Sequence, residues 1–253
     1  ARTRLAPFGE RFLAIHGRFG ELPTLLSTHC IGKLDGLVVD LGVSSMQLDR
    51  RERGFSFQKP GPIDMRMDPT QGESAHDLIR RLRTDQLAAI LSEYGEERFA
   101  GRVARAIAQA ETAGELTDTL SLSSVIARAL PRTDPHKHPA TRTFQALRIA
   151  VNDELRQLHH LLSAAPSLLA PGGRLAVISF HSLEDRIVKR HFAGISDGTE
   201  ALGAGRRLSA LIRRPQLPTE AELAENSRSH SARLRVAELL PPSQAATEAA
   251  CRP

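Results

Sequence analysis

An acidic side chain and two hydroxyl groups stand close together where an apolar run ends. Asp40 lies near the end of the run at residues 35–42, and Ser44 and Ser45 follow it. Ligands of open α/β sheets bind beyond the carboxyl ends of the strands. If the run is a strand, Asp40 and the loop at residues 41–48 face a ligand. The alternative is that Asp40 caps a helix, which is the commoner role of such an acid.

A second candidate position follows another apolar run, at residues 174–180. His181 comes directly after this run and precedes Ser182. The residues alone leave two roles open for His181. Its ring either lines a ligand pocket or has a purely structural role.

Two groups of residues look like metal sites but lack the ligands that such sites need. His136 and His138 are flanked by prolines, and no nearby Cys completes a set. Residues 64–68 resemble a calcium loop, but Arg66 takes a position that such a loop needs for an oxygen ligand. We therefore expect no metal ion.

Composition limits the class of protein. The chain has 253 residues, of which 41% are hydrophobic and 25% charged, as in soluble globular proteins. Its net charge of +5 makes a polyanionic partner plausible without deciding the fold. Cys30 and Cys251 form no Cys-x-x-Cys pair, and no apolar run approaches the roughly 20 residues of a membrane span. We expect a cytoplasmic protein.

Short apolar runs alternate with helical stretches at both ends of the chain. The runs at residues 12–17, 35–42 and 174–180 are typical of buried strands, and residues 21–27 predict a helix. This alternation predicts an α/β fold with a parallel sheet covered on both sides. Residues 232–237 alternate as a half-exposed strand does.

Residues 73–130 change character and predict consecutive helices. Ser74 and Thr84 are suitable N-caps, and a long loop at residues 51–71 precedes them. Three apolar stripes follow at helical spacing. They contain Leu87, Ile90 and Leu91, then Phe99, Val103 and Ile107, then Leu122, Val125, Ile126, Ala129 and Leu130. We interpret the block as a helical subdomain inserted into the α/β fold.

The second half returns to the alternating pattern. Apolar residues from Phe144 to Leu162 predict one long amphipathic helix, and a Pro-Gly-Gly turn at residues 170–173 ends it. Ser182 then caps another helix. The expected organisation is a core in two parts with an insertion and a disordered tail, at residues 1–72, 73–137, 138–240 and 241–253.

Three long segments carry a resemblance to a known family. They read DLGVSSMQLD at 40–49 with ERGFSF at 52–57 and GPIDMRMD at 61–68, then HPATRTFQALRIAVN at 138–152, then AVISFHSLEDR at 176–186. The turn between a helix and a strand at 168–175 is also typical of class I methyltransferases. Together the segments closely resemble the ribosomal RNA small subunit methyltransferase H family, also called the MraW family. The resemblance extends from Ala1 to about Leu240.

The resemblance implies a fold and an activity. The fold is a class I, Rossmann-like methyltransferase core with an inserted all-helical subdomain. The activity is transfer of a methyl group from S-adenosylmethionine to N4 of a cytidine in the P-site region of 16S rRNA. The family's cofactor-contacting positions match Phe19, Asp40 and Gln47. The resemblance also implies the 30S subunit as partner and a homodimer.

The chain departs from the family's pattern in places. A Gly-rich loop with a His, and an acid after the next strand, hold the cofactor in the family, and the matching region would precede Ala1. Met46 stands where the family has Pro, and residues 226–231 depart from a pattern with Pro and Arg. In the class I strand order 3-2-1-4-5-7-6, the runs at 12–17 and 35–42 match strands three and four. We therefore expect this chain by itself to bind S-adenosylmethionine poorly and to fold marginally.

The implied reaction needs groups that accept the N–H bonds of the cytosine amine. The lone pair of this amine is delocalised into the ring, so acceptors that help the nitrogen become pyramidal, together with alignment, favour attack on the methyl group. Candidate acceptors are Asp40, Ser44, Ser45 and the carbonyl groups of their loop.

Several arginines are candidates for contacts to RNA phosphates. Arg98, Arg102 and Arg105 recur at helical spacing, and Arg142 and Arg148 extend the set. Such stripes are most often solvated helix faces, but an RNA substrate makes phosphate contacts an alternative of equal weight.

Two other functions are compatible with the sequence. A truncated, inactive relative could still hold RNA through its basic helices, and an activity assay separates it from the enzyme. A methyltransferase of the same fold acting on DNA or a small molecule is disfavoured by the three matching segments.

Overall fold

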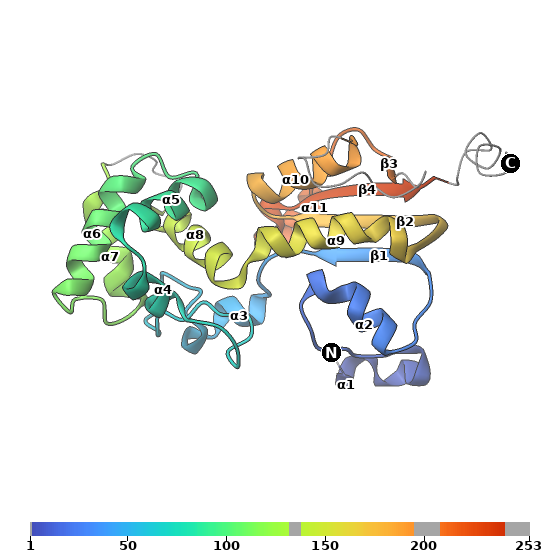
Figure 1. Ribbon diagram of the computed structural model, residues 1–253, viewed down its shortest axis with the longest axis horizontal. Coiled ribbons are helices and arrows are strands. Elements are labelled where there is room, and N and C mark those ends of the chain that lie inside the picture. The colour runs from blue at the N-terminus through green and yellow to red at the C-terminus, as the bar shows by residue number, and fades with distance from the viewer. Residues whose placement is uncertain (1, 132–137, 195–207, 241–253) are drawn as a thin grey trace, which may run out of the picture. The chain divides into compact units, whose positions relative to one another are not determined.

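The computed structural model describes residues 2–131, 138–194 and 208–240 of the chain (Figure 1). Two compact units divide it. The sheet unit comprises residues 1–41 and 155–253, and the helical unit comprises residues 42–154. The expected disordered tail at residues 241–253 lies outside the described residues.

The sheet unit contains every named strand of the described residues. Its strands are β1 (Leu34–Asp40), β2 (Leu169–Ser179), β3 (Leu208–Ala210) and β4 (Arg233–Leu239). Its helices are α1 (Arg2–Leu5), α2 (Leu22–Thr28), α9 (Glu154–Leu168), α10 (Ser182–Phe192) and α11 (Glu220–Glu225), with 3-10 helices at Ala6–Arg11, Phe19–Glu21 and Ser227–Ser231.

The sheet has the order β1-β2-β4-β3. The pair β1 and β2 is parallel, with Leu37 opposite Leu175 and Asp40 opposite Ile178. Strand β4 is antiparallel to both β2 and β3, so the sheet is mixed and the prediction of an all-parallel sheet is wrong. With β1 as strand four, the observed order is the 4-5-7-6 part of the class I order, and the predicted fold class is confirmed.

One face of this sheet is buried in the described residues, and the other ranges from half-buried to exposed. Leu175 and Val177 of β2 pack with residues of α9 and with Val188 of α10, and α9 runs along the sheet in Figure 1. On β1, Val39 is 7% exposed, whereas its neighbour Val38 is 72% exposed. The expectation that this strand is buried on both faces is therefore wrong.

Three local predictions in the sheet unit need correction. Residues 12–17 form no strand, because no described strand pairs with them, and Leu13 is exposed. The turn at residues 170–173 lies inside β2, where the pairing with β1 shifts register. The cap of α10 is His181 rather than Ser182, which is the first helical residue.

The helical unit is built from helices and an ordered loop. Its helices are α3 (Ser45–Asp49), α4 (Ala75–Arg81), α5 (Thr84–Gly95), α6 (Ala100–Thr112), α7 (Thr119–Ala129) and α8 (Thr141–Asn152), with a 3-10 helix at Arg51–Arg53. The predicted helical block is confirmed as α4 to α7, and Ser74 caps α4 as expected. Arg83 rather than Thr84 precedes α5, and Phe99 is exposed at the start of α6 instead of lying in its buried stripe.

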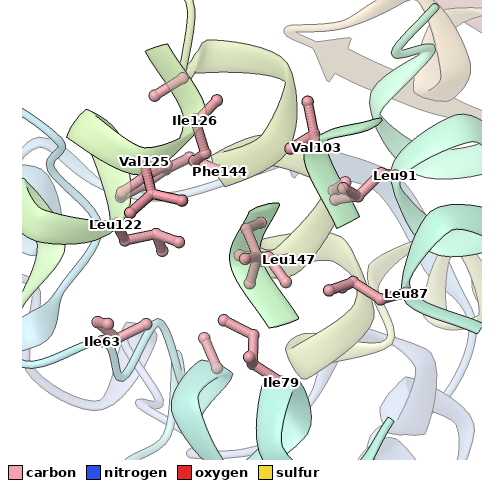
Figure 2. Close-up of a cluster of buried hydrophobic side chains, with 14 of the residues drawn as sticks. Ile63, Ile79, Leu87, Leu91, Val103, Leu122, Val125, Ile126, Phe144 and Leu147 are labelled. Carbon is pink, nitrogen blue, oxygen red and sulfur yellow. The ribbon is translucent and has the colours of Figure 1, made fainter. Parts of the chain in front are cut away.

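The core of the helical unit joins all three predicted stripes to α8. Leu87, Val103 and Leu122 come from three successive helices and converge with Leu147 of α8 (Figure 2). The predicted single helix from Phe144 to Leu162 is wrong, because Asp153 adopts a left-handed φ of 55° and separates α8 from α9.

The long loop at residues 51–71 is held by polar contacts and by burial. An Nη2 atom of Arg53 donates to the carbonyl groups of Arg66 and Met67 at 2.9 and 2.8 Å. Asn152 of α8 donates to the carbonyl of Met65, whose side chain is 1% exposed. These contacts explain why a segment without regular structure contributes to the core.

Candidate functional site

Asp40 occupies the carboxyl end of β1, beside the end of β2. The parallel register sets Asp40 opposite Ile178, which lies three residues before His181. Asp40 is exposed to solvent, but partial desolvation raises its pKa, and the negative charge of Glu184 raises it further. The charges of two acids therefore interact at the edge of the sheet where ligands of α/β proteins bind.

Glu184 is the buried member of this pair. It is 2% exposed, and its Oε2 accepts the backbone N–H groups of Phe180 at 2.8 Å and of His181 at 3.3 Å. In return, the Nδ1 atom of His181 accepts the backbone N–H of Glu184 at 3.4 Å. The two side chains form a reciprocal cap at the start of α10. Nε2 of His181 lies 3.2 Å from Oε1 of Glu184.

A second buried acid anchors α10 to the sheet. Asp185 receives hydrogen bonds from Nε of Arg235 at 2.7 Å and from Nη1 of Arg233 at 3.1 Å. Burial opposes ionisation of Asp185, but the two arginines prevail and its pKa is lowered. The ion pair fixes the helix that carries Glu184.

Phe19 lies in a short 3-10 helix, half-buried against the apolar core of the sheet unit. The next residue, Gly20, donates its N–H to Oε1 of Gln157 on α9 at 3.1 Å. A Cβ atom at Gly20 would overlap this amide, so a larger residue here would displace the Gln157 side chain. The segment that presents Phe19 is thus fixed to α9.

The candidate residues of the helical unit lie at the start of α3. The hydroxyl of Ser44 accepts the N–H of Gln47 at 3.3 Å, and Oε1 of Gln47 accepts the N–H of Ser44 at 2.9 Å. The Ser44 hydroxyl therefore caps a helix, a role that the sequence analysis considered for Asp40 but not for Ser44. Ser45 is exposed in the first turn of α3.

The predicted RNA-contacting arginines separate into two groups. Arg98, Arg102, Arg105 and Arg142 are exposed, although Arg98 precedes α6 and so does not share its helical face. Arg148 is part-buried, and its Nε and Nη2 donate to the carboxylate of Glu154 at 2.8 and 3.0 Å. We therefore assign Arg148 to the interior of the helical unit.

The model of the MraW methylase family matches residues 1–240. The chain belongs to this family. It is 52% identical over 239 residues to the ribosomal RNA small subunit methyltransferase H of Cereibacter sphaeroides strain ATCC 17025, covering 90% of this chain and 70% of the relative. It is 50% identical over 250 residues to the same-named protein of Anaeromyxobacter sp. strain K, covering 95% of this chain and 80% of the relative.

Membership of the MraW methylase family agrees with the class I strand order, and a methylase requires a methyl donor. Among the predicted site residues, Phe19 and Asp40 belong to the sheet unit, and Ser44, Ser45 and Gln47 belong to the helical unit. Sequence reasoning missed Glu184. The signal was its place three residues after His181, since a capping box pairs the cap with its third following residue.

In the part of the chain that the structure describes, no three His, Cys, Asp or Glu side chains are grouped so as to hold a metal ion. No described helix has both the length and the apolar character needed to cross a membrane.

Proposed function

We propose that the chain transfers a methyl group from S-adenosylmethionine to N4 of a cytidine in the P-site region of 16S rRNA, with the small ribosomal subunit as substrate. The carrying observation is the position of Asp40 at the carboxyl end of β1, within a chain that the MraW methylase family matches over residues 1–240. The names of the two relatives support rRNA as the substrate class.

The residues present suit a cofactor with an adenosine part and a charged sulfonium centre. Asp40 offers a carboxylate at the strand end, and the fixed ring of Phe19 offers a surface for stacking on adenine. The oxygen of the Gln47 side chain is used by Ser44, so its amide N–H groups serve as donors. When bound, S-adenosylmethionine supplies an electrophilic methyl group.

The chain's own part in the chemistry is to accept hydrogen bonds from the amine and to align it. A carboxylate at Asp40 accepts an N–H bond of the target amine, which lets the nitrogen lone pair leave conjugation with the ring. The exposed hydroxyl of Ser45 is a second acceptor, whereas Ser44 acts through its cap of α3. Alignment of the amine supplies much of the rate acceleration.

We assign RNA phosphate contacts to exposed arginines of the helical unit. Arg102 and Arg105 lie on α6, Arg98 precedes that helix, and Arg142 lies in the first turn of α8. Within the described residues none of the four is in an ion pair, so their guanidinium groups remain available to phosphate.

We also propose how the chain is organised and where it acts. A methyltransferase core at residues 1–72 and 138–240 carries an insertion at residues 73–137, which lies within the helical unit. The protein would act in the cytoplasm on 30S subunits, as a homodimer.

The test is methyl transfer from labelled S-adenosylmethionine to 30S subunits and to naked 16S rRNA, with the modified base identified by mass spectrometry. The chain is assayed on both substrates in parallel. N4-methylcytidine at one P-site position supports the proposal. RNA binding without product on either substrate would instead favour an inactive RNA-binding relative, for which the exposed arginines are the supporting observation.

A further inference from the structure

Two aromatic rings from distant parts of the sequence are stacked in the helical unit. The rings of Phe57, in the long loop, and His138, just before α8, have centroids 4.5 Å apart and an angle of 17° between their planes. Phe57 also meets the buried ring of Phe144 edge-on, with centroids 5.4 Å apart. The stack therefore rises from the core of the unit, where Phe144 lies in Figure 2, toward solvent.

His138 is the outer ring of this stack. His138 is exposed, whereas Phe57 is half-buried. Nδ1 of His138 accepts the N–H of Ala140 at 3.2 Å, and its carbonyl accepts the N–H of Thr141 at 3.0 Å. The first contact fixes the orientation of the ring, and the second joins its backbone to the start of α8. One face of a flat, preoriented ring is thus presented to solvent.

Cationic side chains lie close to the stack along the chain. Lys59 is two residues beyond Phe57, a span of at most about 7 Å of extended chain. Arg142 is four residues beyond His138, in the first turn of α8. Both residues are exposed, and neither takes part in an ion pair with a described residue. An aromatic face with cations beside it is the arrangement that holds single-stranded nucleic acid.

We propose that the exposed face of His138 stacks on an unpaired nucleobase of single-stranded RNA, with Arg142 and Lys59 contacting the adjacent phosphates. The inference rests on the proposed function, because it takes RNA as the ligand. It adds a base-stacking position in the helical unit, whereas the acids at the sheet edge belong to the sheet unit. Stacking tolerates any base, so the site holds the strand and does not read its sequence.

The probe is a single-stranded oligoribonucleotide that contains 2-aminopurine, whose fluorescence falls when it stacks on a flat ring. His138→Leu keeps an apolar side chain against Phe57 but removes the flat ring, and His138→Phe keeps both. We expect His138→Leu to weaken binding by roughly 5- to 150-fold and to abolish the quenching. His138→Phe should retain both binding and quenching.

Controls separate stacking from folding and from charge. His29→Leu removes another exposed imidazole, which contacts the carbonyl of Leu25 and belongs to the sheet unit, and it should leave binding unchanged. Thermal unfolding of each variant reports on stability. Arg142→Gln should reduce the salt dependence of binding without abolishing the quenching.

The proposal is overturned if His138→Leu binds and quenches like the unchanged protein. It is also overturned if His138→Phe loses binding as fully as His138→Leu while both remain folded, because a flat ring would then not suffice. Methyl transfer by the unchanged protein is measured separately. A protein that methylates 30S subunits yet shows no effect of His138→Leu refutes the stacking site alone.

Discussion

Oε2 of Glu184 accepts the backbone N–H of Phe180 at 2.8 Å. This bond joins the first turn of α10 to the chain just beyond the end of β2, beside Asp40 at the end of β1. The carboxylate of Glu184 thereby serves two purposes at once. It fixes the backbone at the sheet edge, and it adds negative charge next to Asp40.

Replacing Glu184 should change the pH dependence of methyl transfer. Partial desolvation and the charge of Glu184 both raise the pKa of Asp40, so Glu184→Gln removes one of the two causes. If ionised Asp40 accepts the amine proton, the acidic limb of the pH profile for kcat should move to lower pH. The rate at neutral pH should fall, because a glutamine amide cannot replace both charge-assisted bonds to the backbone.

The matched control for this prediction is Glu225→Gln, which changes an exposed acid on α11 of the same unit. It should leave the profile unmoved. An acidic limb that stays in place in Glu184→Gln would show that Asp40 does not control it.

Asp40→Asn should weaken S-adenosylmethionine binding by about tenfold or more, the loss expected when a hydrogen bond to a charged group is removed. Calorimetric titration measures the affinity. Asp35→Asn alters an exposed acid on the same strand and should bind as before. Equal affinities in the two variants would remove Asp40 from the cofactor site.

Breaking the ion pair between α10 and β4 should cost stability. Asp185→Asn leaves Arg235, which is 7% exposed, without its anion, and losing one partner of a buried pair costs about 3–5 kcal/mol. Urea unfolding measures this loss. Asp85→Asn breaks an exposed ion pair with Arg83 and should cause little change. A loss no larger than that of the control would contradict the anchoring role.

The same ion pair predicts how the stability of the fold changes as the pH falls. The folded-state pKa of Asp185 is lowered, so its contribution to stability is present above its unfolded value of about 3.9. That contribution is lost as the pH falls from there through the folded value. As the pH falls through this acidic range, Asp185→Asn should therefore lose less stability than the unchanged protein.

Mild acid should destabilise the sheet unit through His191. Burial lowers the pKa of His191, and the nearby His159 lowers it further, while Nε2 of His191 is buried without a hydrogen-bond partner. The unfolded chain then binds the proton more readily, so stability is present above about pH 6.5 and declines as the pH falls toward the folded pKa.

Urea unfolding between pH 5 and 8 tests this prediction. His191→Phe should flatten the dependence, whereas His160→Phe, which changes an exposed residue of α9, should retain it. If the stability of His191→Phe depends on pH as steeply as that of the unchanged protein, other groups cause the dependence.

Removing arginines from α6 should reduce the salt dependence of RNA binding. If Arg102 and Arg105 each contact a phosphate, replacing both by Gln should lower the log–log salt slope by roughly 1.4. Arg83→Gln removes an exposed arginine of the same unit that is paired with Asp85, and it should leave the slope unchanged. Binding curves at several salt concentrations decide between these outcomes.

Several features could be predicted from the sequence because they depend on neighbours along the chain. The buried stripe of Val103 and Ile107 follows from helical periodicity, and the cap of α4 at Ser74 depends on Asp77, three positions further along the chain. The long motifs around Asp40 likewise indicate the family from the sequence alone.

Only the tertiary structure decided the features that depend on distant partners. Residues 12–17 have the composition of a strand but pair with no described strand. On β1 the side chain of Val38 is exposed, because burial depends on what packs against it. Arg148 could be a surface cation by spacing, yet Glu154 holds it inside. Phe57 and His138 are 81 positions apart, so their stacking required the fold. Periodicity fixes which face of an element is apolar, but long-range contacts decide which groups are buried, paired or left open.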